Sequence, residues 1–290
     1  MEIGTTNIPL ADWVVNPTRP EEARSRRLAS IRQLVEGYGL SAVELGLDMA
    51  IVYPHIFDAG FYVAVADLQQ ELGFTCTVHL PFLWLDASSL NEPVRQASVD
   101  CLRRAVELTR PVEVTTYVLH LWGSATIEIA TVLADSPRRE VVFVGLMIQA
   151  GRSLAEMCEL LDPRDLCVEN LEAPSFDIAL PLVERYGVGI CLDVGHLAYG
   201  YGHGNGDGDA FDFLARHGDR VREVHLHDFV CVSAGELAQT RDHLPLGRGQ
   251  MDTAAFLRRL EEMNFAGPVI LEVNSKPDLE ESLEQVKSFL

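Results

Sequence analysis

Short apolar runs alternate with longer amphipathic segments from one end of the chain to the other. The runs are too short for helices and suit strands of a parallel sheet that is buried on both faces. We expect eight strands, at residues 2–6, 42–46, 75–80, 115–121, 166–170, 190–193, 221–227 and 268–273.

The segments between these strands have helical spacing, often with a glycine at the end or a proline in the first turn. We expect helices at residues 21–38, 58–72, 93–109, 127–161, 177–186, 210–217, 253–263 and 278–289. Within 127–161, residues 141–144 could instead form a strand, but the pattern favours helix. A long loop is expected from the seventh strand to Gly249.

Strands that alternate with helices, without a linker or a break in composition, predict a single (β/α)₈ TIM barrel over residues 1–290. The alternative is a doubly wound sheet. That fold would need a glycine-rich loop after the first strand, and residues 5–9, Thr-Thr-Asn-Ile-Pro, do not provide one.

Composition narrows the class of partner. The chain has 23 Lys and Arg against 43 Asp and Glu, a net charge of -20, so the phosphate backbone of duplex nucleic acid would be repelled. A small-molecule substrate is therefore expected. The N-terminal residues lack a basic region, and no apolar run approaches the roughly 20 residues of a membrane helix. Because the six cysteines show no Cys-x-x-Cys spacing, we expect unpaired thiols and a cytoplasmic protein without membrane contact.

Ionisable side chains stand at nearly every expected strand end. They are Glu44, His79, His120, Glu169, Asp193 with His196, His225 with His227, and Glu272. In a barrel these ends meet at one mouth, so residues distant in sequence become neighbours. Gly195 is expected to let the chain turn sharply and return His196 over that mouth.

Each of these residues also has a simpler interpretation. Asp193 could only cap the next segment, His79 and His120 could be core histidines, and Glu44 could hold an arginine instead of contacting substrate. Between the two histidines of the seventh strand, His225 is the better metal ligand and His227 lies nearer the loop. As a group, mixed imidazole and carboxylate ligands indicate a divalent metal, with zinc favoured and manganese or cobalt as alternatives.

The chain resembles the xylose-isomerase-like TIM-barrel superfamily, which includes sugar isomerases, epimerases and the AP endonuclease family 2 (endonuclease IV type) of repair enzymes. The motifs that carry the likeness are Val-Glu-Asn-Leu-Glu (168–172), Leu-Asp-Val-Gly-His (192–196), Val-His-Leu-His-Asp (224–228), Asp-His-Leu-Pro-Leu-Gly-Arg-Gly (242–249) and Leu-Glu-Val (271–273). The resemblance implies a metal held by Glu169, Asp193, His225 and Glu272, with His196 close by.

Two chemistries follow from the resemblance. Isomerases and epimerases use one ion and an acid/base pair of carboxylates, here Glu169 and Glu272. The endonuclease branch adds histidines that hold further ions, for a total of one to three, and His79, His120, His196 and His243 match that set. Arg241 stands where the endonuclease pattern has Asp, and Asp242 is shifted by one residue, so Arg241 could bind a phosphate oxygen instead.

A narrower similarity, to cobamide-remodelling phosphodiesterases, rests on Ile3-Gly-Thr-Thr, the His79-Leu-Pro stop and Leu108-Thr-Arg-Pro with Tyr117-Val-Leu-His. The sequence therefore favours a metal-dependent phosphodiesterase that acts on a small molecule such as a corrinoid. A sugar phosphate isomerase or epimerase is the alternative, and a non-catalytic ligand-binding barrel is the third hypothesis. Glu169, Glu272 and His196 are the expected catalytic residues, and Glu44, Arg241 and His227 the expected substrate contacts.

Overall fold

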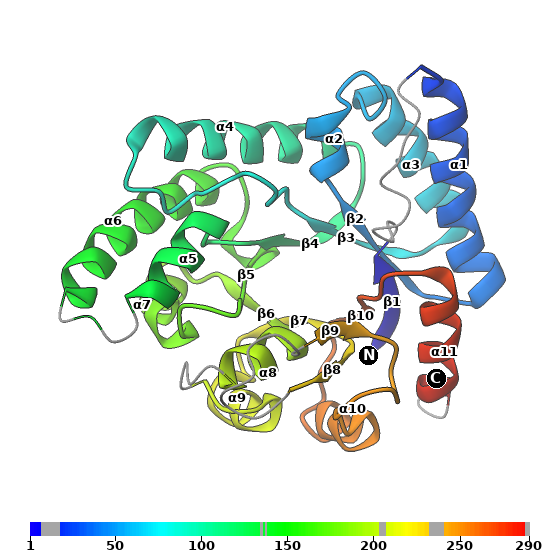
Figure 1. The fold of residues 1–290 in the computed structure, drawn as a ribbon. Helices are drawn as coiled ribbons and strands as arrows, with labels where there is room; N and C mark the ends of the chain where they lie inside the picture. Colours follow the sequence, from blue (N-terminus) through cyan, green and yellow to red (C-terminus); the bar gives the residue numbers. More distant parts are fainter. Residues whose placement is uncertain (7–17, 134–135, 137, 203–206, 232–240, 288–290) are drawn as a thin grey trace.

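The barrel that the sequence predicts is present in the computed structural model, which describes residues 1–6, 18–133, 136, 138–202, 207–231 and 241–287. Parallel strands close in the order β1-β10-β7-β6-β5-β4-β3-β2 (Figure 1). Their bounds are Glu2–Thr6 (β1), Ala42–Gly46 (β2), Thr75–His79 (β3), Val114–Leu119 (β4), Leu166–Glu169 (β5), Gly189–Asp193 (β6), Val221–Leu226 (β7) and Pro268–Leu271 (β10).

Helices connect the strands and form the outer layer of the barrel (Figure 1). Their bounds are Pro20–Arg32 (α1), extended by the π-helical segment Gln33–Gly37, then Asp48–Val52 (α2), Ala59–Leu72 (α3), Glu92–Thr109 (α4), Ser124–Val132 (α5), Arg139–Cys158 (α6), Phe176–Tyr186 (α7), Val194–Gly202 (α8), Ala210–His217 (α9), Thr253–Glu262 (α10) and Lys276–Val286 (α11). A 3-10 turn, Pro163–Asp165, precedes β5.

Four connections differ from the sequence prediction, and the first is α2, a short helix between β2 and α3 that was not predicted. The segment 127–161 forms α5 and α6 rather than one helix, and residues 141–144 are helical, as favoured. The expected turn at Gly195 was wrong, because α8 begins directly after β6. The long loop after β7 contains an antiparallel hairpin, β8 (Asp228–Val230) with β9 (Arg241–Leu244). These strands have only three and four residues, too few for an alternation of apolar and polar positions to indicate them.

The core follows the two-residue period of the strands. Val43 and Leu45 flank Glu44 on β2 and belong to the apolar core with the surrounding helices, whereas Glu44 is buried among polar groups. Successive side chains of a strand point to opposite faces, so the apolar residues face the helix layer and the ionisable ones the barrel interior. The interior near the mouth is therefore built from acids and imidazoles rather than from aliphatic side chains.

Helix α6 is unusually apolar. By length and composition it is the one helix among the described residues that could cross a membrane, and 39% of its most apolar stretch is buried inside the protein. It packs against α4 and α7 as part of the outer layer. Val141, Val144 and Ile148 remain exposed on it.

All six cysteines are free thiols, as the sequence predicted. Cys76, Cys167 and Cys191 are buried within barrel strands. Burial raises the pKa of each of these thiols, because a thiolate is poorly solvated there. They are therefore unreactive core residues.

Candidate metal centre and active site

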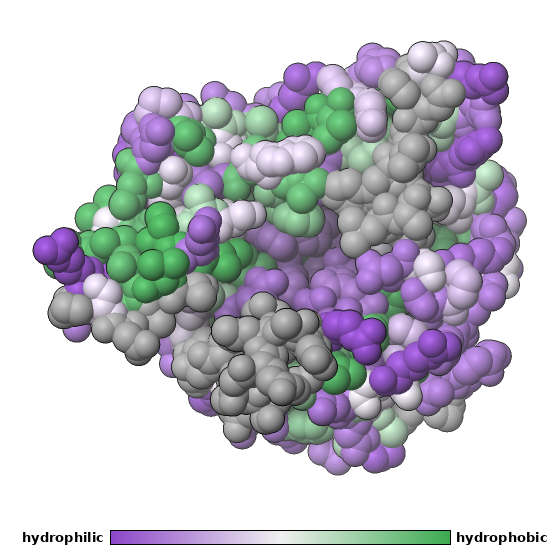
Figure 2. Space-filling model, viewed as in Figure 1, coloured by the Kyte–Doolittle hydropathy of each residue, from purple (hydrophilic) through white to green (hydrophobic). Residues whose placement is uncertain are grey.

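A cavity of about 410 Å³ opens at the carboxyl ends of the strands, where a TIM barrel places its active site. Figure 2 shows a hydrophilic hollow there, bordered on one side by apolar surface over α5 and α6. Its polar lining includes Glu44, His79, His120, Glu169, Glu172, His196, His243, Glu272 and Asn274, and its apolar lining includes Phe82, Leu83, Trp122 and Leu171. A pocket of this size and mixed character suits a small polar molecule.

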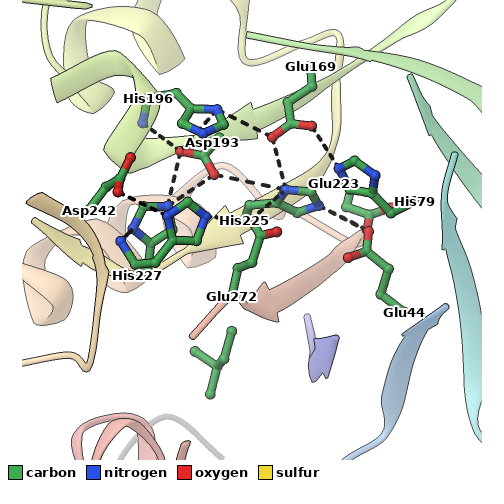
Figure 3. Close-up of polar contacts among 12 residues, drawn as sticks. Glu44, His79, Glu169, Asp193, His196, Glu223, His225, His227, Asp242 and Glu272 are labelled. Atoms are coloured by element: carbon green, nitrogen blue, oxygen red, sulfur yellow. Dashed lines mark hydrogen bonds and ion pairs between the residues drawn. The ribbon is translucent and has the colours of Figure 1, made fainter. Parts of the chain in front are cut away.

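Four side chains from four strands converge beneath this cavity. Glu169, Asp193, His225 and Glu272 each offer a ligand atom, and these atoms all lie within 4.8 Å of one another. His225 Nδ1 lies 3.2 Å from Glu169 Oε1 and 3.3 Å from Glu272 Oε2 (Figure 3). The neighbouring strands β6 and β7 hold Asp193 opposite His225 in register. The residues that the sequence grouped are therefore neighbours.

This group fits a divalent cation. Glu272 Oε2 is buried and makes no hydrogen bond to any described residue, although it points toward His225 Nδ1. A buried polar atom without a partner indicates a missing ion or water. Three carboxylates so close together would also repel one another without a positive charge. One imidazole with three carboxylates is a donor set that zinc, manganese or cobalt accepts.

A second group shares Glu169. His120 Nε2 lies 2.8 Å and His79 Nε2 3.2 Å from Glu169 Oε2, while the other oxygen of Glu169 faces His225. His79 is only 5% exposed, as expected for a core histidine. Its Nε2 nevertheless contacts Glu169, a carboxylate of the site. His79 and Glu169 also offer ligand atoms within 4.8 Å of His225, so a second ion would lie at His79 and Glu169, with His120 next to it.

Asp193 is fixed by several hydrogen bonds. Its Oδ1 accepts from the backbone N–H of His196 at 2.6 Å, and Asn170 bonds both its N–H and its carbonyl oxygen. His227 Nδ1 accepts from the N–H of His243 at 2.8 Å, so its proton is on Nε2, which donates to Asp193 at 3.1 Å. The capping alternative for Asp193 is thus also realised, since it binds the first turn of α8.

The β8–β9 hairpin decides which residue of 241–243 faces the site. Arg241 is exposed and is absent from the cavity lining, whereas Asp242 groups with His196 and Glu172 within 4.8 Å. His243 lines the cavity, 3.6 Å from Glu272 Oε2. Asp242 stands one residue after the position of the Asp in the endonuclease pattern, but the hairpin still brings it close to His196. Asp242 rather than Arg241 therefore provides charge there.

The three expected substrate contacts lie in different places. Glu44 borders the cavity but is fully buried, and its Oε1 contacts His225 Nε2 at 3.1 Å rather than an arginine. His227 is fully buried outside the cavity lining and stacks on His243, with ring centroids 4.2 Å apart. The expectation of substrate contact does not match the positions of His227 and Arg241.

The electrostatics of the site couple its histidines to its acids. Burial by itself would lower the pKa of His79, but the hydrogen bond to Glu169 and the charges of Glu169 and Glu44 outweigh it and raise this pKa to about 10. Burial would also lower the pKa of His196, but the charges of Asp193, Glu172 and Glu169 outweigh burial and raise this pKa to about 9. Burial would raise the pKa of Glu169, but His120 and His225 hold it well below its usual range. Without metal, His79 and His196 therefore form imidazolium–carboxylate pairs near neutral pH.

This coupling predicts how metal binding depends on pH. The folded-state pKa values of His79 and His196 exceed the usual 6.5, so their pairs stabilise the metal-free protein fully below pH 6.5. That stabilisation is lost as pH rises through about 9 for His196 and about 10 for His79. The pKa of the ligand His225 also lies well above its usual value despite burial, and a metal at the four-ligand group must displace its proton. We therefore expect zinc affinity to rise with pH, and the melting temperature of the metal-free protein to fall between pH 6.5 and 9.

Chelator-competition titrations and thermal melts across this range measure both trends. A metal affinity independent of pH, with no proton release on binding, would contradict the imidazolium assignment.

Comparison with known proteins places this arrangement in a family. The family model described as xylose isomerase-like TIM barrel matches residues 32–290. The chain belongs to this family. The superfamily that the sequence motifs indicated is thereby confirmed, and the ligand positions described above lie within the matched region.

Individual relatives are distant. The uncharacterized protein MJ1311 of Methanocaldococcus jannaschii is 23% identical over 77% of this chain and 73% of its own length. Among solved structures, a D-tagatose 3-epimerase-like protein is 19% identical, with a TM-score of 0.71 over 100% of this chain and 97% of its own. The TTHB071 protein of Thermus thermophilus, from a crystal soaked with ZnCl₂, is 23% identical, with a TM-score of 0.62 over 99% and 97% of the two chains. At these identities the likeness of the solved structures shows the fold alone.

Some residues of the site escaped the sequence analysis. Asn170 follows Glu169 and ties β5 to Asp193, and Asp48 accepts from the N–H groups of Phe82 and Leu83, which line the cavity. Asn170 lay inside the Val-Glu-Asn-Leu-Glu motif, and that was a usable signal. Asp48 had none, because its partners are 34 and 35 residues away in sequence.

Proposed function

We propose that the protein is a metal-dependent isomerase or epimerase of a small sugar or sugar phosphate. The observation that carries this proposal is that two carboxylates, Glu169 and Glu272, both line the cavity and both lie within 3.3 Å of His225 Nδ1. Their strands, β5 and β10, are separated in the barrel by β6 and β7, so the two carboxylates reach the cavity from different positions on its rim. With two carboxylates at different positions, one can remove a proton from a substrate carbon and the other can return one.

The residues divide the chemistry as follows. Glu169, Asp193, His225 and Glu272 would hold a zinc, manganese or cobalt ion, which when bound polarises the substrate oxygens and so acidifies the adjacent C–H. One of Glu169 and Glu272 removes that proton and the other supplies a proton. His196 and Glu172 line the cavity and would bind the hydroxyl groups of the substrate. The low pKa of Glu169, which His120 and His225 maintain against burial, keeps this base ionised near neutral pH.

The likeness to a D-tagatose 3-epimerase-like protein supports this proposal over the hydrolase that the sequence favoured. The comparisons give no support to a cobamide substrate. One observation still favours a second candidate, the hydrolysis of a small phosphodiester. His79 and His120 meet at Glu169 Oε2, which would allow a second ion and a metal-activated water.

Solvent exchange tests the proposed function directly. The protein, supplied with zinc, manganese or cobalt in deuterated water, is incubated with a panel of ketoses, ketose phosphates and a corrinoid phosphodiester. We expect deuterium to enter a ketose at the carbon next to the carbonyl, together with formation of an epimer or an isomer. Release of phosphomonoester without exchange into any ketose would reject the proposal in favour of the hydrolase.

A double variant, His79→Ala with His120→Ala, separates the two candidates by metal demand. For an isomerase that uses one ion, we expect ketose turnover to fall less than about tenfold, because neither residue belongs to the four-ligand group. For a hydrolase, the variant should lose one equivalent of metal and most of its activity. Metal analysis and kinetics of the same preparation provide both measurements. His217→Ala, at the last residue of α9 and outside the ligand groups, is the control for loss of a histidine.

A further inference from the structure

His225 is held from both of its ring nitrogens. The side chain is fully buried, and Nδ1 faces Glu169 and Glu272 while Nε2 lies 3.1 Å from Glu44 Oε1 (Figure 3). Glu44 comes from β2 and His225 from β7, two strands that are not neighbours in the barrel. The contact between them therefore crosses the barrel interior.

The chemistry of imidazole makes this contact consequential. A neutral ring carries one proton, and a metal binds the nitrogen that lacks it. Nδ1 is the nitrogen that faces the four-ligand group, so the proton must be on Nε2 when a metal is bound. The opposite tautomer would direct an N–H at the metal position and a lone pair at the carboxylate of Glu44.

We propose that Glu44 is a positioning residue, which accepts the Nε2 proton of His225 and thereby directs the Nδ1 lone pair to the metal. The inference rests on the metal centre of the proposed function and extends it, because Glu44 itself is not one of the four ligands. A carboxylate that accepts from a metal-bound histidine raises the basicity of the ring and fixes its orientation. Glu44 would then set the metal affinity of the site rather than contact the substrate.

The surroundings of Nε2 single out Glu44 for this role. The other nearby acid, Glu223, has its Oε1 3.7 Å from Nε2, beyond hydrogen-bond distance. Glu223 lies two residues before His225 on the same strand, one layer deeper in the barrel, and is fully buried like Glu44. It therefore provides a matched control for the loss of a buried carboxylate next to the same ring.

Three variants test the proposal: Glu44→Leu, Glu44→Gln and Glu223→Gln. Zinc affinity is measured by competition with a chelator at fixed pH, with far-UV circular dichroism and thermal melts to establish that each variant is folded. We expect Glu44→Leu to bind zinc about 10- to 100-fold more weakly than the wild type. Glu44→Gln keeps an oxygen that can accept from Nε2, so it should recover at least about fivefold of that loss. Glu223→Gln should stay within about threefold of the wild type.

The tautomer itself is observable by ¹⁵N NMR of zinc-loaded protein with labelled histidine. In the wild type, we expect Nε2 of His225 to carry the proton and Nδ1 to show the shift of a metal-bound nitrogen. If Glu44→Leu does not fold, Glu44→Ala replaces it in both measurements, with the same expected loss of zinc affinity relative to the wild type.

The outcomes separate this inference from the proposed function. A wild-type protein that binds no divalent metal would remove the metal centre and the inference together. Tight zinc binding that is equal in the wild type and both Glu44 variants would reject the role of Glu44 and leave the metal centre intact. An equal loss in Glu223→Gln and Glu44→Leu would also reject it, because the effect would then belong to the buried acids in general.

Discussion

Replacing Glu169 by glutamine is expected to lower turnover about 10³-fold. Glu169 is the residue that both ligand groups share, since its Oε1 faces His225 and its Oε2 faces His79 and His120. It is also one of the two proposed proton-transfer groups. A glutamine of the same shape removes the negative charge that holds a metal and the basic oxygen that accepts a proton.

Metal content distinguishes this substitution from loss of the other carboxylate. Glu169→Gln should lose metal from both groups, whereas Glu272→Gln should leave a metal at His79 and Glu169 in place. Metal analysis by mass spectrometry and the deuterium exchange assay give the two measurements. Near wild-type turnover in Glu169→Gln would exclude both proposed chemistries, because each assigns Glu169 to the reacting centre.

Gly195→Ala is expected to destabilise the protein by at least about 3 kcal/mol and to abolish activity. Replacing a glycine within a helix by alanine normally raises the free energy of unfolding by up to about 1 kcal/mol. Here the new Cβ would lie 2.7 Å and 2.9 Å from the two ring nitrogens of His227, and closer still to Cε1. His227 cannot move freely, because it donates to Asp193 and accepts from the N–H of His243.

The matched control is Gly37→Ala, in the π-helical segment after α1. Gly37 is exposed, and its added Cβ would meet only Gln33 Cγ, on a flexible exposed side chain, at 3.2 Å. We expect its free energy of unfolding, measured by urea denaturation, to change by less than about 1 kcal/mol. Equal stability of Gly195→Ala and the wild type would show that the first turn of α8 is not packed against His227.

The role of Gly195 shows where sequence reasoning reached its limit. The glycine was correctly singled out between Asp193 and His196, but it was assigned to a sharp turn. In the structure α8 begins at Val194, and the space that a glycine leaves is filled by a ring from the segment just after β7. A pattern of residues indicates that a small side chain is needed, but it does not show which neighbour requires the space.

The site itself was largely predictable because of the regularity of the barrel. Glu169, Asp193, His225 and Glu272 stand at or next to the carboxyl ends of apolar strands, and a closed parallel barrel brings all such ends to one mouth. The β8–β9 hairpin had no comparable signal. Its pairing joins residues on either side of a long polar segment, and only that pairing decides that Asp242 faces His196 while Arg241 is exposed.

By itself, the sequence determined the barrel, its strand ends and the ionisable residues placed there, because the period of apolar residues and the order of strands and helices are local properties of the chain. Only the tertiary structure decided which atoms meet: the sharing of Glu169 by four histidines, the contact of Glu44 with His225 and the burial of His227. Such contacts depend on the direction of each side chain in a closed barrel, and that direction is set by packing between segments far apart in the sequence.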